Sequence, residues 1–162
     1  MAQPGEWTTD RRAASLSGPD SRLLRRMSVG VAFIGSDEEP PGSCVLVVDS
    51  TLVQRLADLP RERRIGFLAD LDLLGEAVHH VCTRRDRRLV AVELQVTSAG
   101  DRLQAHVCPR YSYPAGRTGP TGAQRDTLRI ELVLELDLVS AAARADYPAR
   151  HVYGARAAHR SV

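Results

Sequence analysis

The most informative pattern in this chain is Leu103-Gln-Ala-His-Val-Cys-Pro-Arg110. Polar or reactive side chains alternate in it with apolar ones, which is typical of a β-strand, because successive strand residues point to opposite faces. A strand here presents Arg102, Gln104, His106 and Cys108 on one face. That face is the best candidate for a functional site in the sequence.

The residues before this strand predict a sheet and one long helix. Apolar runs at 28–34 and 44–48 flank an acidic Pro-Gly turn and predict paired antiparallel strands. Pro60 suits a first helical position, and apolar residues spaced by four and three continue the helix to about Cys82. The residues that show this spacing are Phe67, Leu71, Leu74, Val78 and Val81.

Two further segments complete the expected sheet. The charged run 84–88 predicts a solvated loop. The alternating residues from Val90 to Val96 predict a half-buried strand, and the turn near Gly100 returns the chain as a hairpin with the 103–110 strand.

The leucine-rich segment in the C-terminal third fits two kinds of secondary structure. Leucine or isoleucine at every second position from Leu128 to Leu138 fits a strand, whereas Leu, Glu and Arg favour a helix. We expect an arm at 1–27, one domain at 28–143 and a flexible tail at 144–162, the last because it has no apolar period.

Composition restricts the classes of function. The net charge of the 162 residues is +2, and aromatic residues are 4% of the chain, too few for base-stacking platforms, so we expect no nucleic-acid partner. The sequence has no apolar run long enough for a membrane span and no signal-peptide pattern, so we expect a cytoplasmic protein without a membrane partner. Three cysteines without CxxC spacing predict neither a disulfide framework nor a metal site, and we expect no cofactor.

The 103–110 strand resembles the signature of the histidine-triad (HIT) superfamily of nucleotidyl hydrolases and transferases, in which alternating histidines precede a Val-x-Pro-Arg-like ending. His106 matches the last triad histidine. Gln104 stands where the family carries its covalent nucleophile, and Arg102 stands where it carries the first histidine. The stretches 6–12 and 67–78 look like those of bacterial diadenosine-tetraphosphate hydrolases.

This resemblance implies an α+β fold: an antiparallel sheet of about five strands packed on a long helix, with a second helix near the C-terminus. It favours the helical interpretation of the leucine-rich segment, and it implies a homodimer. The resemblance also places Ser98 where a side chain touches phosphate and Asp37 near a ribose site. Arg102 and Arg110 would neutralise phosphate charge. Cys108 shares the face of His106, where relatives carry an apolar packing residue.

Gln104 decides which chemistry is possible. In the family mechanism an imidazole nitrogen attacks phosphorus and forms a nucleotidyl-histidine intermediate. An amide nitrogen has a delocalised lone pair, so Gln104 donates or accepts hydrogen bonds but is no nucleophile. Whether the chain is an enzyme is left open. Three interpretations of Gln104 and His106 remain: an ordinary hairpin, a ligand site without turnover, and an enzyme with altered chemistry.

The function we expect is hydrolysis or transfer on a nucleotide or another phosphorylated metabolite, without the covalent histidine. In this mechanism Gln104 orients a water molecule and His106 acts as a general acid or base. The alternative is a protein that no longer uses nucleotides. Such a protein would be either a specialised-metabolism enzyme or a non-catalytic binding protein.

Overall fold

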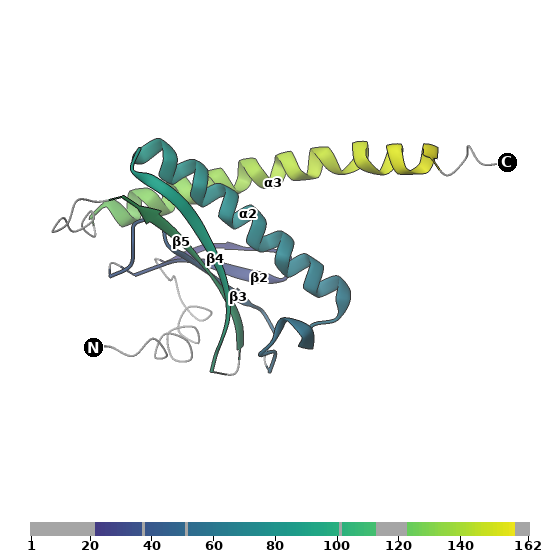
Figure 1. Ribbon diagram of the computed structural model, residues 1–162, viewed down its shortest axis with the longest axis horizontal. Coiled ribbons are helices and arrows are strands. Elements are labelled where there is room, and N and C mark those ends of the chain that lie inside the picture. The colour runs from purple at the N-terminus through teal and green to yellow at the C-terminus, as the bar shows by residue number, and fades with distance from the viewer. Residues whose placement is uncertain (1–21, 37, 51, 101, 113–122, 158–162) are drawn as a thin grey trace.

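The computed structural model describes residues 22–36, 38–50, 52–100, 102–112 and 123–157. Along the chain its elements are β1 (Leu23–Arg26), β2 (Gly30–Ile34), β3 (Cys44–Val48), the short 3₁₀ helix η1 (Leu56–Asp58), α2 (Arg61–Arg85), β4 (Leu89–Ala99), β5 (Arg102–Tyr111) and α3 (Ala123–Ala157). The strands form one layer and both long helices lie on one side of it (Figure 1). The predicted α+β class is confirmed.

The sheet has five strands in the order β1-β2-β3-β5-β4, and every neighbouring pair is antiparallel. The expected β2–β3 pair and the β4–β5 hairpin are both present. Gly100 has a φ of 63° in the hairpin turn, a conformation that favours glycine. The strand that carries the candidate residues therefore lies between two neighbours, β3 and β4.

Helix α2 covers one face of the sheet. Its predicted apolar residues are buried against Ala32, Leu46, Ala105 and Val107, which alternate with the candidate residues along the strands. The helix begins at Arg61, directly after Pro60, and ends at Arg85. The expected end near Cys82 and the loop at 84–88 were therefore placed too early, because Arg84 and Arg85 both bind carboxylates of α3 and extend the last turn.

Helix α3 contains the leucine-rich segment, so the helical interpretation is confirmed. In a helix the alternating leucines separate onto two sides: Leu128, Leu132 and Leu136 enter the core, while Ile130, Leu134 and Leu138 are exposed. The helix continues to Ala157, through most of the segment for which the sequence predicts a tail. Strand β1 likewise lies within the expected N-terminal arm.

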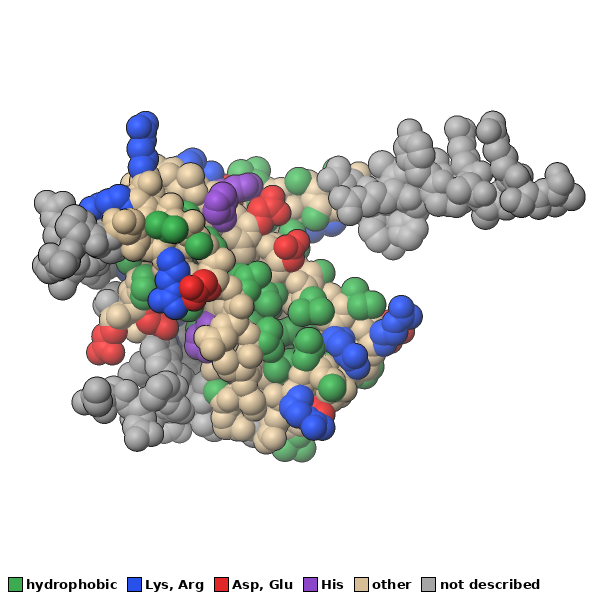
Figure 2. Space-filling view, viewed as in Figure 1, with side chains coloured by type: hydrophobic (Ala, Val, Ile, Leu, Met, Phe, Trp, Pro, Cys, Tyr) green, Lys and Arg blue, Asp and Glu red, His purple; other side chains and the backbone are tan. Residues whose placement is uncertain are grey.

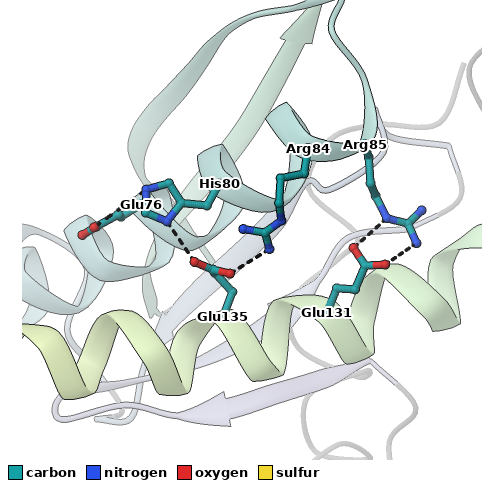
Figure 3. Close-up of polar contacts among 6 residues, drawn as sticks. All are labelled: Glu76, His80, Arg84, Arg85, Glu131 and Glu135. Atoms are coloured by element: carbon teal, nitrogen blue, oxygen red, sulfur yellow. Dashed lines mark hydrogen bonds and ion pairs between the residues drawn. The ribbon is translucent and has the colours of Figure 1, made fainter.

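Ion pairs hold α3 against α2 (Figure 3). The Glu135 side chain is 9% exposed, and its carboxylate accepts hydrogen bonds from Arg84 at 2.7 Å and from His80 Nδ1 at 2.9 Å. One turn earlier on α3, Glu131 binds Arg85 through two contacts of 2.8 and 2.9 Å. Arg84 and, after it, His80 lower the pKa of Glu135.

A buried carboxylate joins α2 to the β1–β2 turn. Asp70 is 3% exposed and accepts hydrogen bonds from the backbone N–H groups of Ser28, Val29 and Gly30 and from the Ser28 hydroxyl, at 2.7 to 3.2 Å. Ser28 and Val29 lie in the turn and Gly30 begins β2, so Asp70 binds the backbone where the second strand starts. Asp70 therefore fixes where α2 lies on the sheet.

Candidate functional site

The candidate residues lie on the sheet face opposite α2. Because paired residues of antiparallel strands share a face, the register defines this face row by row. His106 lies between Val45 on β3 and Gln95 on β4, and Gln104 lies between Val47 and Thr97. We call the surface formed by Val31, Phe33, Val45, Val47, Glu93, Gln95, Thr97, Gln104, His106 and Cys108 the site face.

Gln104 and His106 contact each other on the site face. The Gln104 amide nitrogen is 3.0 Å from His106 Nε2. An amide nitrogen only donates, so this contact uses an unprotonated Nε2 and leaves the ring proton on Nδ1. Burial lowers the pKa of His106, which favours the same neutral form. The pair therefore presents a neutral imidazole and an amide side by side.

The site face has an apolar half and a polar half. Strands β2 and β3 contribute Val31, Phe33, Val45 and Val47, whereas β5 and β4 contribute the polar side chains. Val31 and Val47 are buried but lie outside the core that α2 covers. The accessible apolar part of this face is therefore at Phe33 and Val45, in the row that contains His106.

Cys108 lies on the site face one row beyond His106, opposite Glu93. Burial raises the pKa of its thiol, and the carboxylate of Glu39 raises it further. A nucleophilic cysteine needs the reverse, a lowered thiol pKa. The arrangement therefore favours a packing role for Cys108 over a Cys-His nucleophile pair.

The two predicted arginines have different surroundings. Arg110 follows Cys108 on β5 and donates to Glu93 on the neighbouring strand at 2.7 Å, so its guanidinium is already engaged by a carboxylate. Both side chains of this pair are more than half exposed. Arg102 is half-buried and pairs with Ala99 of β4, in the row next to that of Gln104.

Two predicted residues do not join this group. Ser98 pairs with Leu103, so its side chain belongs to the face that α2 covers, and it is exposed there. Asp37 lies outside the described residues. The structure therefore brings Arg102, Gln104, His106, Cys108 and Arg110 along one strand face and leaves Ser98 on the other.

The sequence did not reveal Glu39 as part of this region. Its carboxylate accepts the Ser36 N–H at 2.9 Å and acts electrostatically on both His106 and Cys108. In the sequence Glu39 is one of three acidic residues in a turn. Only the folded turn distinguishes it from its neighbours.

Within the ranges that the structure describes, no group of three or more His, Cys, Asp and Glu side chains is arranged to hold a metal ion. No helix among these residues is both long and apolar enough to cross a membrane.

The chain matches no family profile, and no curated protein matches it significantly in sequence. Solved structures do match. A histidine triad protein from Marinobacter aquaeolei VT8 has a TM-score of 0.60 and 17% identity, over 82% of this chain and 96% of that one. A HIT-like protein involved in cell-cycle regulation, from Bartonella henselae, has a TM-score of 0.59 and 11% identity, over 82% and 99%.

A third similar structure is the hypothetical histidine triad nucleotide-binding protein of Sulfolobus tokodaii strain 7. Its TM-score is 0.54 and its identity 8%, over 73% of this chain and 85% of that one. At such identities the likeness concerns the fold. The match confirms the fold that the sequence resemblance implied.

Proposed function

Because the chain has the histidine-triad fold, we propose that it binds a nucleotide or another phosphorylated metabolite on the site face and acts on it without a covalent histidine. The observation that carries this proposal is the 3.0 Å contact between Gln104 and His106. It leaves one imidazole, in its neutral form, beside an amide that has no nucleophilic nitrogen. The reaction class is hydrolysis or group transfer at phosphorus.

His106 acts as the general base in this mechanism. When the ligand binds, the Gln104 amide N–H leaves Nε2 of His106 and the Gln104 carbonyl oxygen holds a water molecule. This water attacks phosphorus, and its proton passes to the freed Nε2 as the new P–O bond forms. The bond from phosphorus to the leaving group breaks, and the imidazolium returns the proton to that group. Arg102, on the same strand face, contributes positive charge near the phosphate.

The apolar half of the site face supports a ligand with a ring or another apolar part. Phe33 and Val45 are half-buried in the row that contains His106, so an apolar group on them lies beside the imidazole. A purine or pyrimidine base is such a group. The nucleotide class also agrees with the name of the Sulfolobus tokodaii protein.

The test is a turnover assay on three phosphorylated probes: adenosine monophosphate, diadenosine tetraphosphate and adenosine phosphoramidate. Removing a general base or its partner typically costs on the order of 10²- to 10⁴-fold in rate. We therefore expect Gln104→Ala to reduce turnover and His106→Ala to nearly abolish it. Unchanged rates in both variants would exclude this site.

The restored nucleophile gives a second readout. If the ligand site is intact, Gln104→His should form a nucleotidyl-histidine adduct that mass spectrometry detects, because an imidazole then stands at the nucleophile position. The wild type should form none. An adduct in the wild type would contradict the non-covalent mechanism.

A non-catalytic binding protein is the second candidate function. Two observations favour it: Gln104 and His106 satisfy each other, and Arg110 is engaged by Glu93. This candidate predicts that the probes raise the melting temperature and that none of them is converted.

The proposal includes a homodimer through β4 and α2. Strand β4 ends the sheet among the described strands, and its residues Leu94 and Val96 are 49% and 40% exposed on the face that α2 covers, while Leu68 of α2 is 42% exposed. Figure 2 shows hydrophobic side chains gathered over this part of the molecule. A second copy would extend the sheet through β4 and cover these side chains.

Light scattering after size exclusion tests the dimer. Leu94→Arg should convert the dimer to monomer, because it places a charge in the apolar contact. Leu134→Arg is the matched control, since Leu134 is 60% exposed on α3, away from this patch. Dissociation by Leu134→Arg and not by Leu94→Arg would assign the interface to α3 instead.

A further inference from the structure

The Glu39 carboxylate occupies a space that glycine leaves free. It accepts a hydrogen bond from the Ser36 N–H at 2.9 Å, which holds it over Gly35. A Cβ added at Gly35 would overlap Glu39 Oε2 and would lie 2.9 Å from the Ser43 carbonyl oxygen. The lack of a side chain at position 35 is therefore what allows the carboxylate to lie there.

This space opens on the site face. Side chains alternate between the two faces of β2, so position 35, two residues after Phe33, faces the same side as Phe33. The Gly35 N–H also extends the β2–β3 ladder, because it donates to the Ser43 carbonyl at 2.6 Å. Phe33 shares a row with His106, so the carboxylate over Gly35 lies on the same face, at the level of the next row. Cys108 belongs to that row.

Among the residues that the structure describes, the other charged groups around His106 pair with each other or lie farther along the strands. On β4, Glu93 binds Arg110, so the two charges largely cancel. On β5, Cys108 is a neutral thiol and Arg102 lies two rows from His106. At the end of β3, Asp49 binds Arg63. The carboxylate of Glu39 opposes the effect of burial by raising the pKa of His106.

We propose that Glu39 is a positioning residue for His106: its charge, seated over Gly35, stabilises the imidazolium that forms when His106 takes up a proton. This role rests on the proposed acid–base function of His106. A half-buried imidazole without a nearby carboxylate would resist protonation, because burial disfavours its charged form. Glu39 thereby moves the pH range in which His106 accepts and returns a proton upward, against the larger effect of burial.

The test is an NMR titration of His106 in the full-length protein, which needs no ligand. Glu39→Gln keeps an oxygen for the Ser36 N–H and removes only the charge. We expect the His106 pKa to fall by about half a unit, the size of a charge effect across several ångströms near the surface. Glu39→Asp keeps the charge on a shorter side chain, so it should cause a smaller fall.

Glu38→Gln is the matched control, because Glu38 is the exposed neighbour in the same turn. It should leave the His106 pKa unchanged. An unchanged value in Glu39→Gln, or an equal fall in both variants, would overturn the proposal. If Glu39→Gln does not fold, Glu39→Ala removes the charge instead, and an unchanged His106 pKa in that variant would overturn the proposal.

The titration and the turnover assay can fail separately. A shifted His106 pKa in a protein that converts no phosphorylated probe would support the electrostatic coupling and refute the proposed catalysis. Turnover that depends on His106, with no shift in Glu39→Gln, would do the opposite.

Discussion

Replacing Asp70 by alanine should destabilise the fold strongly. The carboxylate is 3% exposed and accepts four hydrogen bonds, and those from the N–H groups of Val29 and Gly30 are buried. Each buried donor left without a partner costs about 1 to 3 kcal/mol, so two of them at about 1.5 kcal/mol each give a loss of about 3 kcal/mol in the free energy of unfolding. For a domain of this size the melting temperature should fall by about 6 to 12 °C.

Urea unfolding followed by circular dichroism measures this loss. Asp72→Ala is the matched control, because Asp72 is exposed on the same helix, and it should change the stability by less than about 0.5 kcal/mol. Asp70→Asn keeps the shape of the side chain but replaces one acceptor by a donor, so it separates hydrogen bonding from packing. A loss below about 1 kcal/mol in Asp70→Ala, or one equal to that of Asp72→Ala, would refute the role of Asp70 in fixing α2.

Arg84 and His80 lower the pKa of Glu135, so the stabilisation is present above the unfolded-state pKa of about 4.3 and is lost as pH falls through the lower folded-state value. Between about pH 6 and 3, the free energy of unfolding measured with urea should therefore depend less on pH in Glu135→Gln than in the wild type. Parallel curves for the two proteins would contradict this role of Glu135. Gly42 has a φ of 89° and faces Cys82 Sγ, so Gly42→Ala should cost at least about 2 kcal/mol in thermal unfolding, and Cys82→Ala should recover part of this loss.

The sheet and α2 could be predicted from the sequence because their apolar residues repeat with the period of the element. The 103–110 strand and its hairpin partner alternate strictly, and α2 repeats at four and three. The segment 128–139 satisfied both periods, since alternating leucines also supply a helical stripe at Leu128, Leu132 and Leu136. Packing of that stripe on α2 determined the outcome, and no local pattern contains that information.

Only those residues of the candidate site that lie on one strand, β5, could be predicted to lie together. Residues two apart on β5 necessarily share a face, so the grouping of Gln104, His106 and Cys108 followed from the sequence. Ser98 is on the neighbouring strand, and its face depends on the register of the hairpin, which places it opposite Leu103. Glu39 and Asp70 act on residues far from them in sequence, so no spacing in the chain indicates them.

Thermal unfolding with adenosine monophosphate, on the wild type and on His106→Ala, tests whether a nucleotide binds beside His106. At a ligand concentration about one hundred times Kd, binding adds about 2.7 kcal/mol, which raises the melting temperature of a domain of this size by about 5 to 10 °C. We predict this rise in the wild type and a much smaller one in His106→Ala. No rise in the wild type at millimolar ligand, or an equal rise in both proteins, would contradict a nucleotide site beside His106.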